Sequence, residues 1–417
     1  MSRKPAENVV VIGAGINGIS TGIWLRRAGK AVTVIDRLAP GEGASHGNAG
    51  ILAACAIVPV TEPGLITKAP GMVIRPSSPL FLKWPYIPRM IPWLLRYLSH
   101  ANTADTTRIT NHLAPVAMDT VEQHKALAEN TEAEHWLQES DYVFAYASAE
   151  AHEKDRFGWS LREQAGFQPQ ILDGDDVRAY DPNFGPSVNR LVVMGQHGYV
   201  RSPGLYVKAL AKHFEALGGT LVKADVKDFD ITDGTVKAAL TDQGRFPCDA
   251  LVLATGAWSK ALTQKLGLTV PLESERGYHV ILKNARGGPK VPSMIAASKF
   301  VATPMEDGLR CAGLVEFGGL EASPSTAPIE LLMRGVRTAF PQIDYDETEE
   351  WLGHRPAPTD SLPLIGELNS CKGAYTAFGH QHIGLTCGAK TGRLVADMIA
   401  DKGINLDMKP YDPNRFR

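Results

Sequence analysis

Cysteine is scarce in this sequence, and its positions argue against two classes of small stabilised protein. Only five cysteines occur in 417 residues, and no two of them form a C-x-x-C pair. A disulfide framework and a zinc knuckle are therefore excluded, no metal site is predicted, and we expect free thiols in a reducing cytoplasm. The five are Cys55, Cys248, Cys311, Cys371 and Cys387.

An excess of charge of either sign is also missing. The chain carries 43 Lys and Arg against 45 Asp and Glu, so it offers no global field to recruit nucleic acid or an anionic membrane. Apolar residues make up 44% and charged residues 21%, which indicates a packed protein rather than a disordered one. The length exceeds that of one ordinary core and predicts two or three domains.

Long apolar runs free of charge and proline are absent as well. Residues 1–8 are polar and do not form a signal peptide. The most membrane-like stretch, residues 79–98, holds four prolines and three charged residues, Lys83, Arg89 and Arg96, so it does not span a bilayer. Two interpretations remain open for it. It forms part of a lid over a substrate, or it is an aromatic surface that rests on the inner face of the cell membrane.

The N-terminal residues have the pattern of a nucleotide-binding β-α-β unit. Residues 8–12 form a continuous apolar run, which predicts a strand buried on both faces. Gly13, Gly15 and Gly18 follow at G-x-G-x-x-G spacing, and a helix is expected to about residue 28. A second strand over residues 31–35 ends at Asp36. This order of elements predicts dinucleotide binding.

Each part of this pattern has a physical purpose. Gly13 permits a tight turn, Gly15 lets the backbone approach a pyrophosphate, and Gly18 lets the helix pack closely on the strand. The helix N-terminus presents free N–H groups and a partial positive charge to the pyrophosphate. Asp36 stands where a carboxylate accepts hydrogen bonds from ribose hydroxyls.

Further along the chain, α/β segments alternate with segments of different character. We expect helices around residues 120–140 and 150–166, and a helix that starts at Pro203. Buried strands are expected at residues 250–253 and 374–378, and a last helix from about residue 389 to 401. Residues 270–350 have the pattern of strands and loops.

The expected fold class is α/β, with one discontinuous domain and one inserted domain. Residues 1–60, 197–262 and 351–417 are expected to form a Rossmann-like FAD-binding domain. Residues 61–196 and 263–350 are expected to form an α+β substrate-binding domain. FAD is favoured over NAD because the small-residue loop at 43–50 and the glycine-bearing segments at 254–258 and 379–384 are far apart in the sequence, so a cofactor that touches all of them must be long.

These motifs together resemble those of the D-amino acid oxidase superfamily of flavoproteins. The resemblance extends over almost the whole chain. Residues 47–50 (GNAG), followed by 62–64 (EPG) and 75–80 (RPSSPL), are similar to the small-subunit type of bacterial D-amino acid dehydrogenase. The motifs that carry the resemblance are the glycine fingerprint, GASHGNAG (43–50), ATGAW (254–258), GHRPAPTDSLPLIG (353–366) and GHQHIG (379–384).

The resemblance implies positions for the cofactor. The glycine fingerprint and Asp36 should hold the ADP half, the 43–50 loop should run beside the pyrophosphate and the flavin, and Val226 should meet the adenine through its backbone. Gly384 to Thr386 should face the N1/C2=O edge of the flavin, where a helix N-terminus stabilises the negative charge of the reduced ring. The residues expected at FAD are Gly13, Gly15, Ile16, Asn17, Gly18, Asp36, Arg37, Ala44, Ser45, Asn48, Ala49, Gly50, Val226, Thr255, Gly256, Gly384, Leu385 and Thr386.

The resemblance also implies substrate contacts. Arg355 matches the arginine that grips the substrate carboxylate in this superfamily, and the fork geometry of a guanidinium suits a carboxylate. The alternative for Arg355 is a structural ion pair. The further candidates are Arg276 as a second cation, Tyr278 and His279 as hydrogen-bonding partners, and His380 and His382 beside the flavin. For the tyrosine and the histidines a packing role is the alternative.

A departure from part of the superfamily predicts non-covalent FAD. Relatives similar to sarcosine oxidase carry a cysteine near the Arg355 segment that bonds to the flavin, and no cysteine stands there in this sequence. His46 is a less favoured alternative point of attachment.

The expected reaction is the oxidation of an amine α to a carboxylate by hydride transfer to flavin N5. A D-amino acid would give a 2-oxo acid and ammonia, whereas an N-substituted glycine, such as sarcosine or a dicarboxylic secondary amine, would give glyoxylate and a primary amine. No dedicated general base is expected if the enzyme binds the neutral amine. The electron acceptor is oxygen or a membrane quinone. An NAD(P)H-dependent hydroxylase and a non-catalytic nucleotide-binding protein are the minor alternatives.

Overall fold

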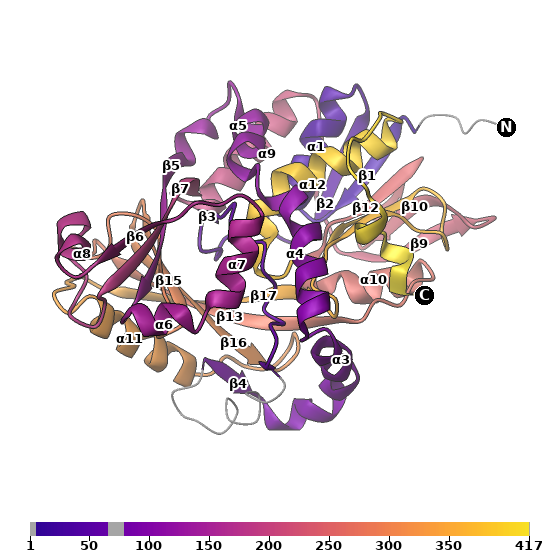
Figure 1. Cartoon of the computed structure of the whole chain (residues 1–417). Helices are drawn as coiled ribbons and strands as arrows, with labels where there is room; N and C mark the ends of the chain where they lie inside the picture. The colour runs from indigo at the N-terminus through magenta and orange to yellow at the C-terminus, as the bar shows by residue number, and fades with distance from the viewer. Residues whose placement is uncertain (1–5, 66–78, 417) are drawn as a thin grey trace.

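The computed structural model describes residues 6–65 and 79–416, and in this part of the chain two sheets dominate the fold (Figure 1). A six-stranded sheet lies at the upper right of the view, and a ten-stranded sheet lies at the left and below. The first four residues of the RPSSPL motif, residues 75–78, lie outside the described residues.

The six-stranded sheet has the order β18-β19-β12-β1-β2-β8. Its strands are parallel except β18, which pairs with β19 in the antiparallel sense. Residues 9–12 and 250–253 are buried throughout, as expected for central strands covered by other elements on both faces. The predicted Rossmann-like sheet is therefore present. Its strands are β1 Asn8–Ile12, β2 Ala31–Asp36, β8 Thr220–Lys223, β12 Ala250–Leu253, β18 Leu364–Glu367 and β19 Ala374–Phe378.

The larger sheet is mixed. Its main path is β17-β13-β16-β15-β14-β5-β7-β3, with β4 paired to β16 and β6 paired to β7. The strands of this sheet are β3 Ile51–Leu52, β4 Leu80–Leu82, β5 Leu137–Tyr146, β6 Gln170–Asp173, β7 Arg190–Val200, β13 Leu272–Lys283, β14 Ser293–Ile295, β15 Phe300–Met305, β16 Gly308–Phe317 and β17 Thr348–Pro358. A separate three-stranded sheet contains β9 Val226–Thr232, β10 Thr235–Thr241 and β11 Gly244–Pro247.

Helices cover both sheets, and α1 lies directly beside α12 above the six-stranded sheet (Figure 1). Small residues make this close approach possible. A Cβ on Gly388 would lie 2.8 Å from Ile16 Cγ1, and the Ser20 hydroxyl donates a 2.7 Å hydrogen bond to the Gly388 carbonyl. The helices are α1 Ile16–Arg27, α3 Ile87–Ser99, α4 Thr103–Ala117, α5 Thr120–Ala128, α6 Ala149–Glu153, α7 Arg156–Gln164, α8 Asp175–Tyr180, α9 Pro203–Ala216, α10 Ser259–Lys265, α11 Ala327–Ala339 and α12 Gly384–Ile399.

The membrane-like stretch forms β4, a short 3-10 turn and the amphipathic helix α3. Met90, Trp93 and Tyr97 are buried on one face of α3, whereas Ile91 and Leu95 on the other face are 45% and 65% exposed. Among residues 6–65 and 79–416, no helix combines the length and the apolarity needed to cross a bilayer.

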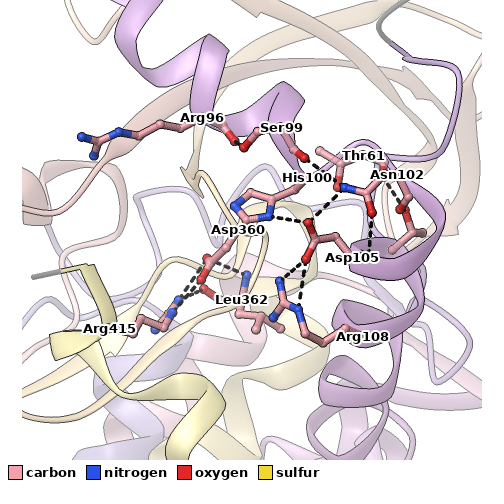
Figure 2. A network of polar contacts seen from close by, with 11 residues as sticks. Thr61, Arg96, Ser99, His100, Asn102, Asp105, Arg108, Asp360, Leu362 and Arg415 are labelled. Carbon is pink, nitrogen blue, oxygen red and sulfur yellow. Dashed lines mark hydrogen bonds and ion pairs between the residues drawn. The ribbon is translucent and has the colours of Figure 1, made fainter.

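A polar network fixes the turn between α3 and α4 (Figure 2). The Asn102 side chain caps α4 by accepting a 2.9 Å hydrogen bond from the Asp105 N–H, and the Asp105 carboxylate contacts His100 and Arg108. Thr106 donates a 2.8 Å hydrogen bond to the Thr61 carbonyl, which ties α4 to the segment before the undescribed residues. Because four side chains meet at this turn, it is a defined corner rather than a loose joint.

Some sequence expectations about elements need correction. The helix expected to reach residue 140 ends at residue 128, and residues 137–146 form strand β5 instead. Helix α11 lies where only strands and loops were expected, and α12 begins at residue 384 rather than 389.

The division into two domains stays a proposal. The six strands of the Rossmann-like sheet come from the three chain segments assigned to the FAD-binding domain. Strand β17 belongs to the larger sheet, because it pairs with β13 along its length, although the expected boundary at residue 351 runs through it. We therefore propose a boundary after β17.

Candidate active site

A cavity of about 800 Å³ lies between the two sheets and brings most of the predicted site residues together. One side is formed by the carboxyl ends of β1, β2 and β12 and by the start of α12. The other is formed by β13, β17 and α3. Ligands of open α/β sheets bind outside the carboxyl ends of the strands, and this cavity occupies that position.

Two glycines where β1 leads into α1 have no space for a side chain. Gly13 has a φ of +108°, and a Cβ there would lie 2.5 Å from the Ala254 carbonyl oxygen. A Cβ on Gly18 would overlap the Gly13 carbonyl oxygen. Gly18 does not line the cavity, so it serves helix packing as the sequence predicts, whereas Gly13, Gly15, Ile16 and Asn17 do line it.

The first turn of α1 has polar groups that a ligand could engage. The Ile16 N–H donates to the Ser45 hydroxyl at 3.1 Å, which connects the helix start to the 43–50 loop. The buried Asn17 Oδ1 atom has no hydrogen-bond partner in the described chain. A buried acceptor without a partner is costly, so this amide is suited to a ligand's hydrogen bond.

Asp36 closes the same side of the cavity. Its two carboxylate oxygens accept hydrogen bonds from the Ala14 N–H at 2.7 Å and the Leu38 N–H at 2.9 Å. Each carboxylate oxygen has a second lone pair, so the group can still accept a ribose hydroxyl. The neighbouring Arg37 lines the cavity with its guanidinium 4.5 Å from the centroid of the Trp258 ring.

The small-residue loop at 43–50 is held against the cavity by an arginine that the sequence reasoning did not identify. Arg310 Nη1 donates to the carbonyls of His46 and Asn48 at 2.8 and 2.7 Å. Ala44, Ser45, Asn48 and Ala49 line the cavity. Gly50 does not, and its φ of +78° and the 2.8 Å approach of its Cβ position to the Val200 carbonyl indicate a turn.

The remaining predicted cofactor residues all line the cavity. Val226 begins β9, and Thr255 and Gly256 follow β12. Gly384, Leu385 and Thr386 form the first turn of α12, for which no side chain acts as an N-terminal cap. Uncapped N–H groups at a helix start suit an anion or an electron-rich ring edge.

These features fit an extended dinucleotide. Two helix N-termini, a carboxylate with free lone pairs and a buried amide oxygen without a hydrogen bond in the described chain border this one cavity. Glycines keep the backbone accessible where a phosphate would approach.

Arg355 lies at the opposite side of the cavity on β17. Its guanidinium passes over Gly277, where a Cβ would lie 2.5 Å from the Arg355 Cζ atom. Nη1 donates to the Leu314 carbonyl at 2.9 Å, and no carboxylate within the described residues forms an ion pair with it. The interpretation of Arg355 as a purely structural ion pair is therefore not supported.

Arg276 and Tyr278 are directed into the fold rather than toward a ligand. Arg276 does not line the cavity, is fully buried and lies 3.1 Å from Glu316, while Nη2 donates to the carbonyls of Ala322 and Ser323. Tyr278 borders the cavity, but its hydroxyl donates to Glu316 at 2.7 Å and accepts from the Ser325 N–H. The structure does not support Arg276 as a second cation for the substrate, because Arg276 already forms an ion pair with the buried carboxylate of Glu316.

The three candidate histidines differ in position. His279 does not line the cavity. Its ring stacks on Trp351 at 5.1 Å, and burial lowers its pKa to about 3. His380 borders the cavity and hydrogen-bonds Thr391, and burial lowers its pKa to about 3. His382 lines the cavity near Arg355, and burial lowers its pKa to about 4. All three rings are therefore neutral at physiological pH.

Two polar residues near Arg355 were missed by sequence reasoning. Glu275 on β13 and Tyr97 on α3 both line the cavity, and each is 5% exposed. Burial raises the pKa of Glu275 to about 7, an effect that the charge of Arg355 opposes. Trp93, which stacks on Tyr97 at 4.5 Å, and Phe317 form the apolar wall around them.

The comparisons with known proteins agree with this geometry. A family model described as FAD dependent oxidoreductase matches residues 8–398. The chain is 37% identical to a D-amino-acid oxidase from Bradyrhizobium diazoefficiens, an alignment that covers 98% of this chain and 99% of the relative. It is 26% identical to a D-amino acid dehydrogenase from the same organism, over 98% of each chain. The solved structure of glycine oxidase from Geobacillus kaustophilus has the same fold, with a TM-score of 0.77, 20% identity and 98% of each chain covered.

Proposed function

Because this chain belongs to the family of FAD-dependent oxidoreductases, we propose that it oxidises a D-amino acid to a 2-oxo acid and ammonia. The C–H bond at Cα is broken as the neutral amine becomes an imine, and water then hydrolyses the imine. When bound, FAD would accept the hydride, which carries the two electrons of this step, and the N–H proton of the amine is released separately. The protein's task is to bind the amino acid, orient its Cα–H bond and exclude water from the cavity.

The single observation that carries the proposal is the guanidinium of Arg355, which lines the cavity and forms no ion pair of 4.0 Å or less with a carboxylate of the described residues. Its neighbours include Leu314, Trp93 and Phe317. A guanidinium there is suited to a carboxylate, because two parallel N–H donors match its two oxygens and the charge is not lost at any physiological pH. A carboxylate fixed in this way orients the adjacent Cα.

A D-amino acid is favoured over an N-substituted glycine by the relatives. The curated proteins aligned over nearly the whole chain are named D-amino-acid oxidase and D-amino acid dehydrogenase. Arg276 does not line the cavity and forms an ion pair with Glu316, so it does not offer the second cation that a dicarboxylic secondary amine would need.

We propose that FAD is bound without a covalent bond. The Arg355 segment contains no cysteine, and His46, the alternative attachment point, does not line the cavity because its ring lies beside Trp351 and Gly204. The ADP half is assigned to the Gly13–Gly15 turn and Asp36. The flavin is assigned to the 43–50 loop and the first turn of α12. Trichloroacetic acid precipitation should leave the yellow colour in the supernatant.

The acceptor that reoxidises the flavin is proposed to be a membrane quinone. The exposed face of α3 carries the apolar residues Ile91 and Leu95 beside the exposed cations Arg89 and Arg96, a combination that suits an anionic bilayer surface. Co-sedimentation with vesicles that contain phosphatidylglycerol should exceed that with phosphatidylcholine vesicles. Rapid hydrogen peroxide formation without vesicle binding would instead identify oxygen as the acceptor.

The experiment that tests the function is anaerobic reduction of the bound flavin. A panel of D-amino acids, their L-enantiomers, sarcosine and iminodiacetate is mixed with the protein, and the loss of flavin absorbance near 450 nm is followed. At least one D-amino acid should bleach the flavin faster than every N-substituted glycine. If an N-substituted glycine is fastest, the substrate class is wrong, and if nothing bleaches the flavin, amine oxidation is wrong.

A further inference from the structure

Within the described part of the chain, a buried carboxylate without a hydrogen bond or a close ion pair lines the same cavity as Arg355. Glu275 is 5% exposed, and no hydrogen bond or ion pair engages its side chain within residues 6–65 and 79–416. Leaving a buried charge unpaired is costly. The carboxylate is therefore suited to a group that is present only when a ligand is bound.

The register of the sheet places Glu275 directly beside Arg355. The two residues are opposite each other on the antiparallel strands β13 and β17, so their side chains leave the sheet on the same face. They do not form an ion pair at 4.0 Å or less. Both residues line the cavity, so a small ligand there has a cation and an anion within one pair of neighbouring strands.

Two other residues on the same face of β13 help to locate the Glu275 side chain. Gly277, two positions after Glu275, leaves the space in which the Arg355 guanidinium lies. Glu273, two positions before it, is already engaged, because it accepts hydrogen bonds from the Tyr86 hydroxyl at 2.9 and 3.0 Å. Only Glu275 of these two carboxylates lines the cavity.

Helix α3 supplies a third polar group. The buried hydroxyl of Tyr97 has no hydrogen-bond partner in the described chain, and its pKa is raised by burial and by the negative charge of Glu275. Tyr97 can therefore donate to a ligand carboxylate or to Glu275 itself. A cation, an anion and a neutral donor converge at one end of a cavity whose walls there are otherwise apolar.

We propose that Glu275 binds the α-ammonium group of the amino acid while Arg355 binds its α-carboxylate, and that Glu275 then removes one proton from that ammonium group. This inference rests on the proposed function. The transfer breaks one N–H bond and forms one O–H bond on Glu275, which leaves a neutral amine and a neutral carboxyl group. The lone pair on nitrogen is then free for the oxidation at Cα. The sequence analysis expected no dedicated general base. In this proposal Glu275 is such a base.

The charges around Glu275 set the expected pH dependence. Its pKa is raised to about 7 as the net result of burial, which raises it, Arg355 on β17, which lowers it, and Glu273 on the same strand, which raises it. The pKa of Tyr97 on α3 is raised as well, so that hydroxyl is neutral. A protonated Glu275 cannot accept a proton. We therefore expect kcat/KM to rise with pH through about 7. In the Glu275→Gln variant this rise of kcat/KM with pH should be absent.

A binding experiment tests the ammonium contact without turnover. 2-Methylalanine has no hydrogen on Cα and cannot be oxidised, and trimethylacetate is its isostere with a methyl group in place of the ammonium group. Their Kd values for the FAD-loaded protein are measured from the change in flavin absorbance at pH 8. We expect a preference for 2-methylalanine on the order of 10- to 100-fold, the range for hydrogen bonds between charged groups.

Three variants distinguish the contact of Glu275 with the ammonium group from the contact of Arg355 with the carboxylate. Glu275→Gln should abolish the preference for 2-methylalanine, whereas the matched variant Glu273→Gln should keep it. Arg355→Lys should weaken both ligands together. A preference that survives in Glu275→Gln would overturn the proposal.

The unaltered protein provides a readout that does not depend on any variant folding. Its preference for 2-methylalanine should fall between pH 8 and pH 6 as Glu275 becomes protonated, and a preference that is constant over this range would also overturn the proposal. These failures are distinct from failure of the function, which is judged by flavin bleaching in the unaltered protein.

Discussion

Two arginines on neighbouring strands have opposite environments. Arg276 and Arg355 are one register position apart across β13 and β17, yet only Arg355 reaches the cavity. The alternation of side chains along a strand explains the difference, because adjacent positions face opposite sides of the sheet. Arg276 is neutralised by Glu316 behind the sheet, whereas Arg355 keeps its charge for a ligand.

This difference predicts the effects of two matched substitutions. Arg355→Lys should lower kcat/KM by about 100-fold, because a lysine cannot make the two-pronged carboxylate contact, and hydrogen bonds to charged groups contribute about 1.5–3 kcal/mol each. The Tm should change little. Arg276→Lys should lower the Tm instead, since it disturbs a buried ion pair, and should leave KM close to that of the unaltered protein. Steady-state kinetics and thermal unfolding measure both effects, and equal losses of kcat/KM in the two variants would contradict the assignment.

Gly277 offers an independent test of how the guanidinium is positioned. A Cβ at this position would lie 2.5 Å from Arg355 Cζ, so Gly277→Ala should push the side chain away from its present place. We expect KM to rise about tenfold or more, because a displacement near 1 Å is enough to impair a positioned contact. Gly403→Ala is the control, since a Cβ there meets nothing within 4 Å. An unchanged KM in Gly277→Ala would show that Arg355 does not depend on this space.

Some residues of the site could be predicted from the sequence and others could not. The cofactor residues were accessible because glycine spacing, Asp36 and the helix starts have local signatures. Glu275 was not, because every residue of β13 except the last is buried, so no alternation of polar and apolar residues reveals which face meets the cavity. Arg310 was missed because its contact with the 43–50 loop joins residues more than 260 positions apart.

At the scale of elements, the prediction succeeded where a local pattern determines the structure. The bounds of β1, β12 and β19 match the sequence prediction, since each is a short apolar run next to a glycine turn. The first residues of β5, 137–140, were predicted as helix, because the half-buried pattern of this strand depends on pairing with β7, which begins 44 residues after β5 ends. The start of α12 was placed late, because Gly384 and Thr386 favour helices weakly and are held there by tertiary contacts.

The close crossing of α1 and α12 predicts a linked effect on stability and on FAD. A Cβ on Gly392 would lie 2.5 Å from the Thr21 backbone nitrogen and would overlap the Ser20 hydroxyl. Gly392→Ala should therefore separate the helices, with a cost of about 1–3 kcal/mol that exceeds the gain in helix propensity. Both helices start at the cavity, so FAD should also dissociate faster. Urea unfolding and fluorescence of released FAD measure the two effects, and a stabilised Gly392→Ala protein would contradict the crossing geometry.

At the scale of the whole molecule, the five cysteines lie in separate parts of the core, so the reactivity of each thiol measures how accessible its part of the core is. Cys387, Cys311 and Cys55 lie in three different hydrophobic clusters, and Cys248 and Cys371 share a fourth. All five are buried. Burial raises the pKa of Cys55 to about 11 and that of Cys387 to about 12. At pH 8 no more than about one Cys55 thiol in a thousand is ionised, so the native thiols should react slowly.

Removal of FAD should make one of these thiols reactive before the others, because Cys55 alone among the five lines the cavity. We expect alkylation by iodoacetamide, followed by peptide mass spectrometry, to label none of the five rapidly in the FAD-loaded protein. Cys55 should be labelled first after FAD is removed, and all five should react in denaturant. Cys55→Ser should abolish the early reaction and leave the others unchanged. If Cys311 and Cys387 reacted as fast as Cys55 in the FAD-free protein, the cofactor would be holding together the entire fold, not only the walls of its cavity.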